Sequence, residues 1–336
     1  MKNATKQSRP VIHKAVDFYY GSGLTTLAFY KTRHLIFHWM NTHDSEQPMM
    51  QPNPVCIVMA CDTKYFFQLQ VCLETLRQWP TPFGSDIKVI AIDLQEEQLE
   101  WLRAQSIDVF TDIDRFPRFK NGPRYYAAMA ARPYIPETFP GYKAYLWVDS
   151  DIRFLSGEGL AYYMQSALDP RVNIVIAQQS EPAYYFVLNP VAASFVARTT
   201  YARMIESFGI ETANFLRYSP LYNAGIFSAR ADSPFWSRYK RNLEQILHID
   251  AHLAREQDAL NVAIAEVGRV KDAPSIYNWL VEASIPVRLS DGSWVSPLEQ
   301  SRKVSVAHLV RSEGRCNIPG QSGTMYDFYR KIGLTR

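Results

Sequence analysis

The sequence has few cysteines, and their spacing suits neither a disulfide framework nor a zinc site. The 336 residues include four, Cys56, Cys61, Cys72 and Cys316, and no two of them form a Cys-x-x-Cys pair. Disulfide-stabilised secreted domains and structural zinc modules are therefore excluded as classes. The pattern favours buried, reduced cysteines in a cytoplasmic protein.

Neither sign of charge dominates, and no apolar run is long enough to cross a membrane. The 36 basic residues against 33 acidic ones leave a net charge of +3, so composition does not indicate a nucleic-acid surface. The longest apolar stretch, residues 24–40, is short and contains Lys31, Arg33, His34 and His38. The polar, basic start does not predict a secretory signal. We therefore expect a cytoplasmic protein, with any membrane contact being peripheral.

Several common catalytic motifs are also missing. Gly21-Ser22-Gly23 lacks the Lys-Ser/Thr of a phosphate-binding P-loop, and no Gly-x-Ser-x-Gly elbow indicates a serine hydrolase. His248 and His252 have the i, i+4 spacing that places two metal ligands on one face of a helix. Without a third ligand or a glutamate between them, they predict a metal site only weakly.

The chain divides into three predicted regions. Residues 1–53 are aromatic and basic and end in a polar linker, residues 54–315 carry an α/β pattern, and residues 316–336 form a tail with glycine and proline. Rings such as Phe18 and Trp39 in the first region predict helices that bury them on another surface. Two interpretations stay open: a helical extension packed on the rest of the chain, or a peripheral membrane or partner surface within residues 1–50.

Between residues 54 and 315 apolar strands alternate with helical segments. Strands are predicted at 55–60, 88–93, 108–110, 144–148, 173–177, 222–228 and 304–310, and helices at 66–79, 96–105, 125–131, 190–208, 235–247 and 258–267. The helix over 125–131 is expected to stop near Pro133 and Pro136. This alternation predicts an α/β fold with a mainly parallel central sheet and helices on both faces.

Asp149-Ser150-Asp151 is the most informative motif. It follows the apolar run 144–148, so both carboxylates lie where a predicted buried strand ends. Side chains at i and i+2 of an extended chain point the same way, and oxygens from both can reach one hard divalent cation. Because open α/β sheets bind ligands at the carboxyl ends of their strands, the motif predicts a metal-diphosphate site. The alternative is an acidic surface turn.

Further motifs follow in a defined order along the chain. They are Ala60-Cys61-Asp62-Thr63-Lys64-Tyr65, Arg132-Pro133-Tyr134-Ile135-Pro136, Tyr222-Asn223-Ala224-Gly225, Glu256-Gln257-Asp258, Tyr277-Asn278 and, ending an alternating strand, His308. An aspartate can accept from a uracil N–H, an aromatic ring can cover a base, and two carboxylates with an imidazole suit Mn²⁺. Singly, Asp62 could be a helix cap, Asp258 a charge at a helix start and His308 a core histidine.

In this order the motifs resemble glycosyltransferase family 8, the retaining enzymes of the GT-A fold, over about residues 54–315. The resemblance implies a Rossmann-like catalytic domain and metal-dependent transfer of a sugar from a nucleotide sugar, most simply a UDP-sugar. It implies that Asp149, Asp151 and His308 bind Mn²⁺ or Mg²⁺.

The same resemblance implies a nucleotide side and a sugar side of the donor site. Asp62 and Tyr65 would hold the base, and Ser150 would touch the ribose. The residues that would position the sugar, or act beside it in catalysis, are Arg132, Asn223, Gln257 and Asp258. Gly225 would let the backbone approach a ligand closely.

Two features depart from the family's pattern. The His-x-x-Gly-x-x-Lys-Pro-Trp ending is not present after His308, so Arg311 or Arg315 would have to replace the lysine that contacts the diphosphate. Glu256 stands where the family has an aspartate. These departures affect donor identity more than fold.

Two other functions stay open. A nucleotidyltransferase would also join metal carboxylates to a nucleotide site, although residues 62–65 contain no glycine of the loop expected there. A non-catalytic scaffold could bind a partner through the N-terminal region. The acceptor, whether saccharide, lipid-linked glycan or protein, is not indicated; the loops 178–189 and 209–221 are the candidates for binding it.

Overall fold

The computed structural model describes residues 55–179, 183–184, 190–310 and 323–335. The aromatic N-terminal region, Arg311 and most of the loop 178–189 lie outside the described residues, so their proposed roles stay predictions. None of the described helices is long and apolar enough to cross a bilayer.

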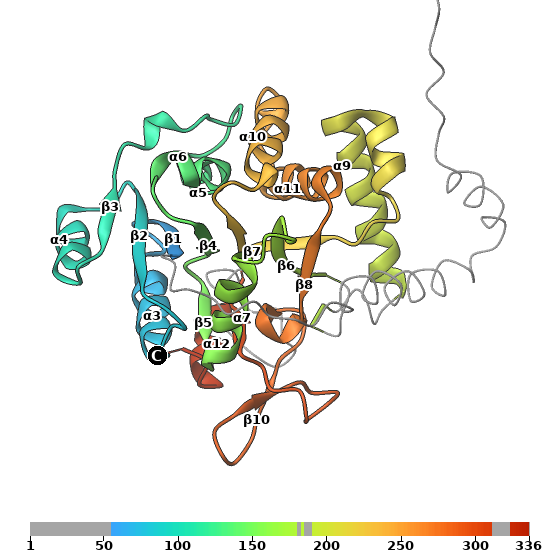
Figure 1. The fold of residues 1–336 in the computed structure, drawn as a ribbon. Coiled ribbons are helices and arrows are strands. Elements are labelled where there is room, and N and C mark those ends of the chain that lie inside the picture. The colour runs from blue at the N-terminus through green and yellow to red at the C-terminus, as the bar shows by residue number, and fades with distance from the viewer. Residues whose placement is uncertain (1–54, 180–182, 185–189, 311–322, 336) are drawn as a thin grey trace, which may run out of the picture. The chain divides into compact units, whose positions relative to one another are not determined.

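A seven-stranded sheet forms the centre of the described chain (Figure 1). Its strands, in spatial order, are β3 (Asp108–Phe110), β2 (Ser85–Ile92), β1 (Val55–Asp62), β4 (Ala144–Val148), β7 (Tyr222–Arg230), β6 (Ile174–Gln178) and β8 (Val270–Ala273). Neighbours pair in parallel except at β7, which runs antiparallel to β4 and β6. The predicted α/β fold with a mainly parallel sheet is confirmed.

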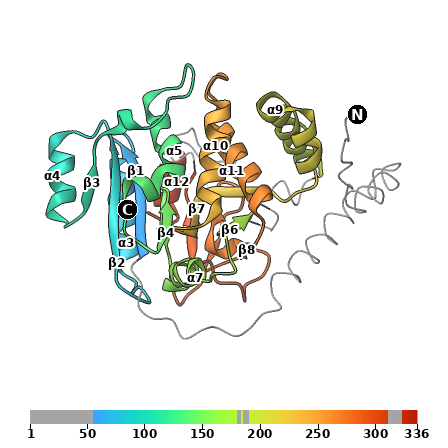
Figure 2. The ribbon, with the colours of Figure 1, turned by 45° about the horizontal axis from the view of Figure 1, so that its top comes forward.

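Helices cover both faces of the sheet because its strands are apolar on both sides. Along β1, Cys56 and Val58 belong to one buried cluster, whereas Val55 and Ile57 belong to another. The first cluster includes residues of α5 (Ala127–Ala131), α10 (Pro234–Ile246) and α11 (Leu253–Val267), and the second those of α3 (Phe66–Arg77) and α7 (Gly157–Ala167). Beyond the edge strand β3 lies α4 (Glu96–Ala104) (Figure 2).

A second sheet of three short strands begins where β4 ends. Only Asp149, Ser150 and Asp151 separate β4 from β5 (Ile152–Phe154), so the acidic motif is the link between the two sheets. The strand β12 (Val306–His308) pairs antiparallel with β5, which puts His308 opposite Ile152. On its other side β12 pairs with β9 (Trp279–Leu280), and β10 (Val287–Arg288) pairs with β11 (Trp294–Val295) in a separate hairpin.

The helix α5 ends at Ala131, before Pro133, as predicted, but the chain stays on a helical path after it. A 3-10 turn at Arg132–Tyr134 and the short helix α6 (Ile135–Thr138) continue it. Pro133 and Pro136 each lie at the first positions of a new helical segment, where no N–H is needed for an intrahelical bond.

Two helices extend into regions predicted as loop or tail. The helix α9 (Pro190–Leu216) breaks at Gly209, whose φ is 82°, directly after the predicted end at residue 208, and a second helical segment follows in the predicted loop 209–221. The helix α12 (Met325–Lys331) begins with a capping box between Thr324 and Asp327. Its buried side packs in a cluster with Trp279, so this part of the predicted tail belongs to a hydrophobic core.

The prediction that His248 and His252 lie on one face of a helix is wrong. His248 follows the end of α10, and His252 is the N-cap of α11. The Nδ1 atom of His252 accepts the backbone N–H of Ala254 at 3.1 Å. This histidine therefore has a capping role, and the pair does not form one metal site.

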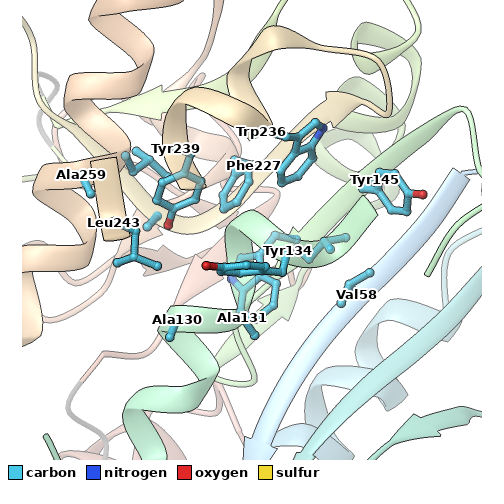
Figure 3. Packing of buried hydrophobic residues seen from close by; sticks show 14 of the residues in the cluster. Val58, Ala130, Ala131, Tyr134, Tyr145, Phe227, Trp236, Tyr239, Leu243 and Ala259 are labelled. Atoms are coloured by element: carbon cyan, nitrogen blue, oxygen red, sulfur yellow. The ribbon is translucent and has the colours of Figure 1, made fainter. Parts of the chain in front are cut away.

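Aromatic rings fill the cluster between the sheet and α10, and two of their hydroxyl groups differ in a way that can be tested (Figure 3). Tyr145 donates to the carbonyl of Phe139 at 2.7 Å, whereas the buried hydroxyl of Tyr239 has no hydrogen-bond partner among the described residues. We expect Tyr145→Phe to lower the free energy of unfolding by about 1–2 kcal/mol, and Tyr239→Phe to leave it unchanged or raise it by about 1 kcal/mol. Urea unfolding of both variants measures this, and equal losses would contradict it.

Candidate metal and donor site

The acidic motif is fixed from two sides by backbone hydrogen bonds. The N–H of Asp149 donates to the carbonyl of Gly225 at 2.8 Å, and the N–H of Leu309 donates to the carbonyl of Asp151 at 3.0 Å. As a result, ligand atoms of Asp149, Asp151 and His308 lie within 4.8 Å of one another. The structure thus brings together the three residues predicted to bind a metal.

Asp149 is held through one carboxylate oxygen. Its Oδ1 accepts the indole N–H of Trp147 at 2.7 Å and Nη2 of Arg132 at 2.6 Å, whereas no described residue donates to Oδ2. Burial raises the pKa of Asp149, although the positive charge of Arg132 opposes this. The free oxygen of this partly buried carboxylate is a good cation ligand, because a bound cation favours the ionised form.

Asp151 and His308 face each other across a short gap. His308 Nε2 lies 3.3 Å from Oδ1 of Asp151, yet this buried oxygen receives no hydrogen bond within the described part of the chain. Burial disfavours the charged form of both groups, but their mutual attraction prevails, lowering the pKa of Asp151 and raising the pKa of His308. An orphaned buried oxygen beside an imidazole fits a divalent cation, which would give both groups a partner.

A chain of hydrogen bonds orients the His308 ring. The backbone N–H of Gly225 donates to Oδ1 of Asn223 at 2.9 Å, so that oxygen is an acceptor. Asn278 Nδ2 donates to the same oxygen at 2.9 Å, which leaves Asn278 Oδ1 to accept from His308 Nδ1 at 3.1 Å. His308 therefore carries a proton on Nδ1, and Nε2, the nitrogen that faces Asp151, is the one that a metal would bind.

Gly225 is needed for close packing against this histidine. A Cβ at position 225 would overlap the His308 ring, 2.6 Å from Nδ1, and would lie 3.0 Å from Oδ1 of Asn223. Gly225 was expected to let the backbone approach a ligand closely. In the structure, the group that lies close to its backbone is the His308 ring.

Arg132 links the motif to the helix α11. Its buried guanidinium donates to Asp149 and, through Nη1, to Oε2 of Glu256 at 2.5 Å, and it lies 5.0 Å from the centre of the Trp147 ring. Burial raises the pKa of Glu256 to about 7, although Arg132 opposes the shift. Oε1 of Glu256 is buried and has no hydrogen-bond partner among the described residues.

Of the four residues predicted to act on the sugar, Arg132 lies beside the acidic motif, and the other three do not all lie together. Asn223 lies in the chain of hydrogen bonds to His308, and Oε1 of Gln257 accepts the N–H of Ala224 at 3.3 Å. Asp258 instead contacts α9, where the guanidinium of Arg203 binds both of its oxygens, with Nη2 2.8 Å from Oδ1.

Asp62 and Tyr65 lie at the carboxyl end of β1, the neighbour of β4 in the sheet. Oδ1 of Asp62 accepts the backbone N–H of Tyr65 at 2.9 Å, so the aspartate stabilises the turn before α3. Tyr65 and Ser150 are half-buried, which leaves part of each side chain accessible to a ligand.

The sequence model of glycosyl transferase family 8 matches residues 56–310. The chain belongs to this family. One similar solved structure is the galactosyltransferase LgtC in complex with donor and acceptor sugar analogs, with a TM-score of 0.51 and 16% identity, covering 83% of this chain and 96% of that one. Another is mouse xyloside xylosyltransferase 1, with a TM-score of 0.50 and 15% identity, covering 80% of this chain and 100% of that one. The bifunctional glycosyltransferase WbbM is also similar, with a TM-score of 0.51 and 15% identity, covering 88% of this chain and 52% of that one. At these identities the structural likeness establishes the GT-A fold alone. A search of curated proteins found no match.

The motifs of this family 8 glycosyltransferase identified the three candidate metal ligands but not the residues that hold them in place. The sequence predicted no role for Trp147 or Arg203. Asn278 entered only as part of the Tyr277-Asn278 motif, and Glu256 only as a departure from the family's pattern. The roles of Trp147 and Asn278 could have been predicted from the sequence. Trp147 precedes Asp149 of the acidic motif by two residues, and Asn278 lies in the Tyr-Asn pair that matches the family's pattern. The role of Arg203 could not have been predicted, because this residue comes from a helix remote in sequence.

Proposed function

We propose that this family 8 enzyme transfers a sugar from a UDP-sugar to an acceptor, with Mn²⁺ or Mg²⁺ and with retention of anomeric configuration. The observation that supports the proposal best is the meeting of Asp149, Asp151 and His308, with Nε2 of the histidine 3.3 Å from an orphaned oxygen of Asp151. Two carboxylates and one imidazole suit Mn²⁺, and the remaining positions would be open to a diphosphate. The acceptor is a saccharide, a lipid-linked glycan or a protein.

The protein's contribution to metal binding is to keep three ligand atoms available. When bound, the cation would offset the negative charge that develops on the leaving diphosphate. Trp147 and Arg132 occupy one oxygen of Asp149 and so hold its other oxygen free. Asn278 keeps the proton of His308 on Nδ1, which keeps Nε2 available as a ligand.

The nucleotide would lie over the ends of β1 and β4. Ligands of open α/β sheets bind at the carboxyl ends of adjacent strands, and Asp62 and Tyr65 are at that end of β1. The Tyr65 ring would stack on the base, Asp62 would accept a uracil N–H, and Ser150 would contact the ribose. LgtC, a protein of similar fold, binds donor and acceptor sugar analogs. This supports a site here that binds both a donor and an acceptor sugar.

The sugar would meet two amide groups whose oxygens are already used. Asn223 Oδ1 accepts from Gly225 and Asn278, and Gln257 Oε1 accepts from Ala224. Each side chain therefore has an NH₂ group left to donate to a sugar hydroxyl or to the departing oxygen. Arg132 is bound to the carboxylates of Asp149 and Glu256. It would partly neutralise their charge and hold both side chains in position beside the sugar.

A thermal-shift panel tests the nucleotide and the metal together. With Mn²⁺ present, UDP at about 100 times its dissociation constant should stabilise the protein by roughly 2.7 kcal/mol, which is several degrees in Tm. GDP, CDP and ADP should give smaller shifts, and EDTA should abolish the UDP response. A UDP response that does not need metal, or no response to any nucleotide, would contradict the proposal.

Two comparisons sharpen this test. The Asp151→Ala variant should lose the UDP response, whereas Asp112→Asn, a change at an exposed aspartate, should keep it. In turnover assays a UDP-sugar should be consumed, while a nucleoside triphosphate with a sugar phosphate should not. The opposite preference would identify a nucleotidyltransferase.

A further inference from the structure

The first turn of α11 contacts two different parts of the protein. Glu256 and Gln257 contact the candidate site, the first through Arg132 and the second through β7. Arg255 and Asp258, which flank them in sequence, contact α9. The orientation of the two residues in the site is thus linked to contacts made with α9.

These contacts to α9 are charged and largely buried. Arg203 binds both carboxylate oxygens of Asp258, and the Asp258 side chain is only 3% exposed. In the reverse direction, Arg255 of α11 donates to Glu206 and to Ser207 Oγ, both at 2.8 Å. All three α9 residues precede the break at Gly209, so these polar contacts come from the first half of α9, whereas Ala213 and Leu216 beyond the break pack in a cluster with Val262 of α11.

The bidentate pair changes what Asp258 can do. A carboxylate that receives two parallel N–H bonds from one guanidinium has both oxygens engaged in strong, geometrically specific bonds. Each oxygen keeps a further lone pair, but the Asp258 side chain is only 3% exposed and faces Arg203, which leaves it little surface for the sugar hydroxyls that the family resemblance implies.

We infer that Arg203 and Asp258 are positioning residues: their ion pair between α9 and α11 fixes the first turn of α11 so that Glu256 and Gln257 face the site. This inference rests on the proposed glycosyl transfer. Arg255, with its bonds to Glu206 and Ser207, supports the same turn from the neighbouring position. Because small displacements of catalytic groups cost large factors in rate, the pair acts on turnover and not on binding of the nucleotide.

Kinetics of single and double variants test the inference. Arg203→Met and Asp258→Asn should each lower kcat by about 10–100-fold, with the KM for the donor and the dissociation constant of UDP with Mn²⁺ changed less than about threefold. The double variant should be no worse than about threefold below either single one, since each change removes the same interaction. Arg203→Lys, which keeps the charge but not the bidentate geometry, should recover part of the loss.

A matched control is Arg198→Met, at an exposed arginine of the same helix, which should leave kcat unchanged. If Asp258→Asn raises the KM for the donor by an order of magnitude while Arg203→Met has normal kinetics, Asp258 binds the sugar directly and the inference is wrong. Variants that lose thermal stability but keep the wild-type kcat would also overturn it, because the pair would then be merely structural.

A measurement without turnover separates this inference from the proposed function. Hydrogen exchange in the first turns of α11 should speed up in Arg203→Met and stay unchanged in Arg198→Met, with exchange in β1 as an internal reference. Unchanged exchange in α11 would reject the positioning role. A wild-type protein that consumes no nucleotide sugar, yet shows this exchange pattern, would refute the proposed function and leave the structural link between α9 and α11 intact.

Discussion

Asp149→Asn is expected to lower the rate of sugar transfer by a factor on the order of 10³ or more, since it removes a metal ligand that helps stabilise the leaving diphosphate. The folded structure should persist. An asparagine can keep an oxygen where Oδ1 accepts from Trp147 and Arg132, while the position of the free Oδ2 becomes an NH₂ group that cannot bind a cation.

The measurement is kcat/KM for the donor as a function of Mn²⁺ concentration, together with Tm. Asp112→Asn makes the same chemical change at an exposed position and should behave as wild type. An Asp149→Asn enzyme with substantial activity and an unchanged dependence on Mn²⁺ would contradict the metal assignment. A large fall in Tm would show instead that the carboxylate is needed for folding.

Gly225→Ala is expected to weaken metal binding and activity by about 10–100-fold, the range seen when a residue supporting a metal ligand is changed. The added methyl group would overlap the His308 ring, which is held in place by its hydrogen bond to Asn278 and by the pairing of β12 with β5. The overpacked strand should also lose about 1–3 kcal/mol of stability. Titration of Mn²⁺ followed by calorimetry measures the first effect, and urea unfolding measures the second.

Two further variants separate the cause from a general loss of packing. Gly84→Ala adds a methyl group where nothing lies within 4 Å, so it should be neutral. In a His308→Ala background the alanine at 225 has room, and its additional effect on metal binding should disappear. An effect of Gly225→Ala that is equally large in both backgrounds would mean that the glycine does not act through His308.

The parts of this protein that could be predicted from sequence are those encoded locally. The buried strands β1 and β4 are continuous apolar runs, and the acidic motif follows β4 directly, so strand, ligands and edge of the sheet come from one short segment. His308 was predicted from its place in an ordered series of family motifs. The structure brings it to the acidic motif because β12 pairs with β5.

The parts that could not be predicted depend on tertiary pairing. The partner of Asp258 is Arg203, from a helix whose sequence carries no sign of that contact, and the arginine between Asp149 and Glu256 joins residues from three separate segments. Local rules also failed where a neighbouring element changed their outcome. The helix α5 ends before Pro133 as expected, but the helical turns that follow it at Arg132–Tyr134 and Ile135–Thr138 were not predicted, and α12 forms in a segment that had been predicted as a tail.

The position of β12 has a consequence for when the enzyme becomes active. This strand pairs with both other strands of the second sheet and also supplies the third proposed metal ligand. A chain still being synthesised, or one cleaved before residue 308, has the acidic motif but not the imidazole. Such a chain would hold the cation weakly, because the binding energy of a metal site becomes available only when its ligands have folded together. If the proposed metal-dependent function holds, donor consumption would be confined to molecules in which synthesis and folding of the domain are complete.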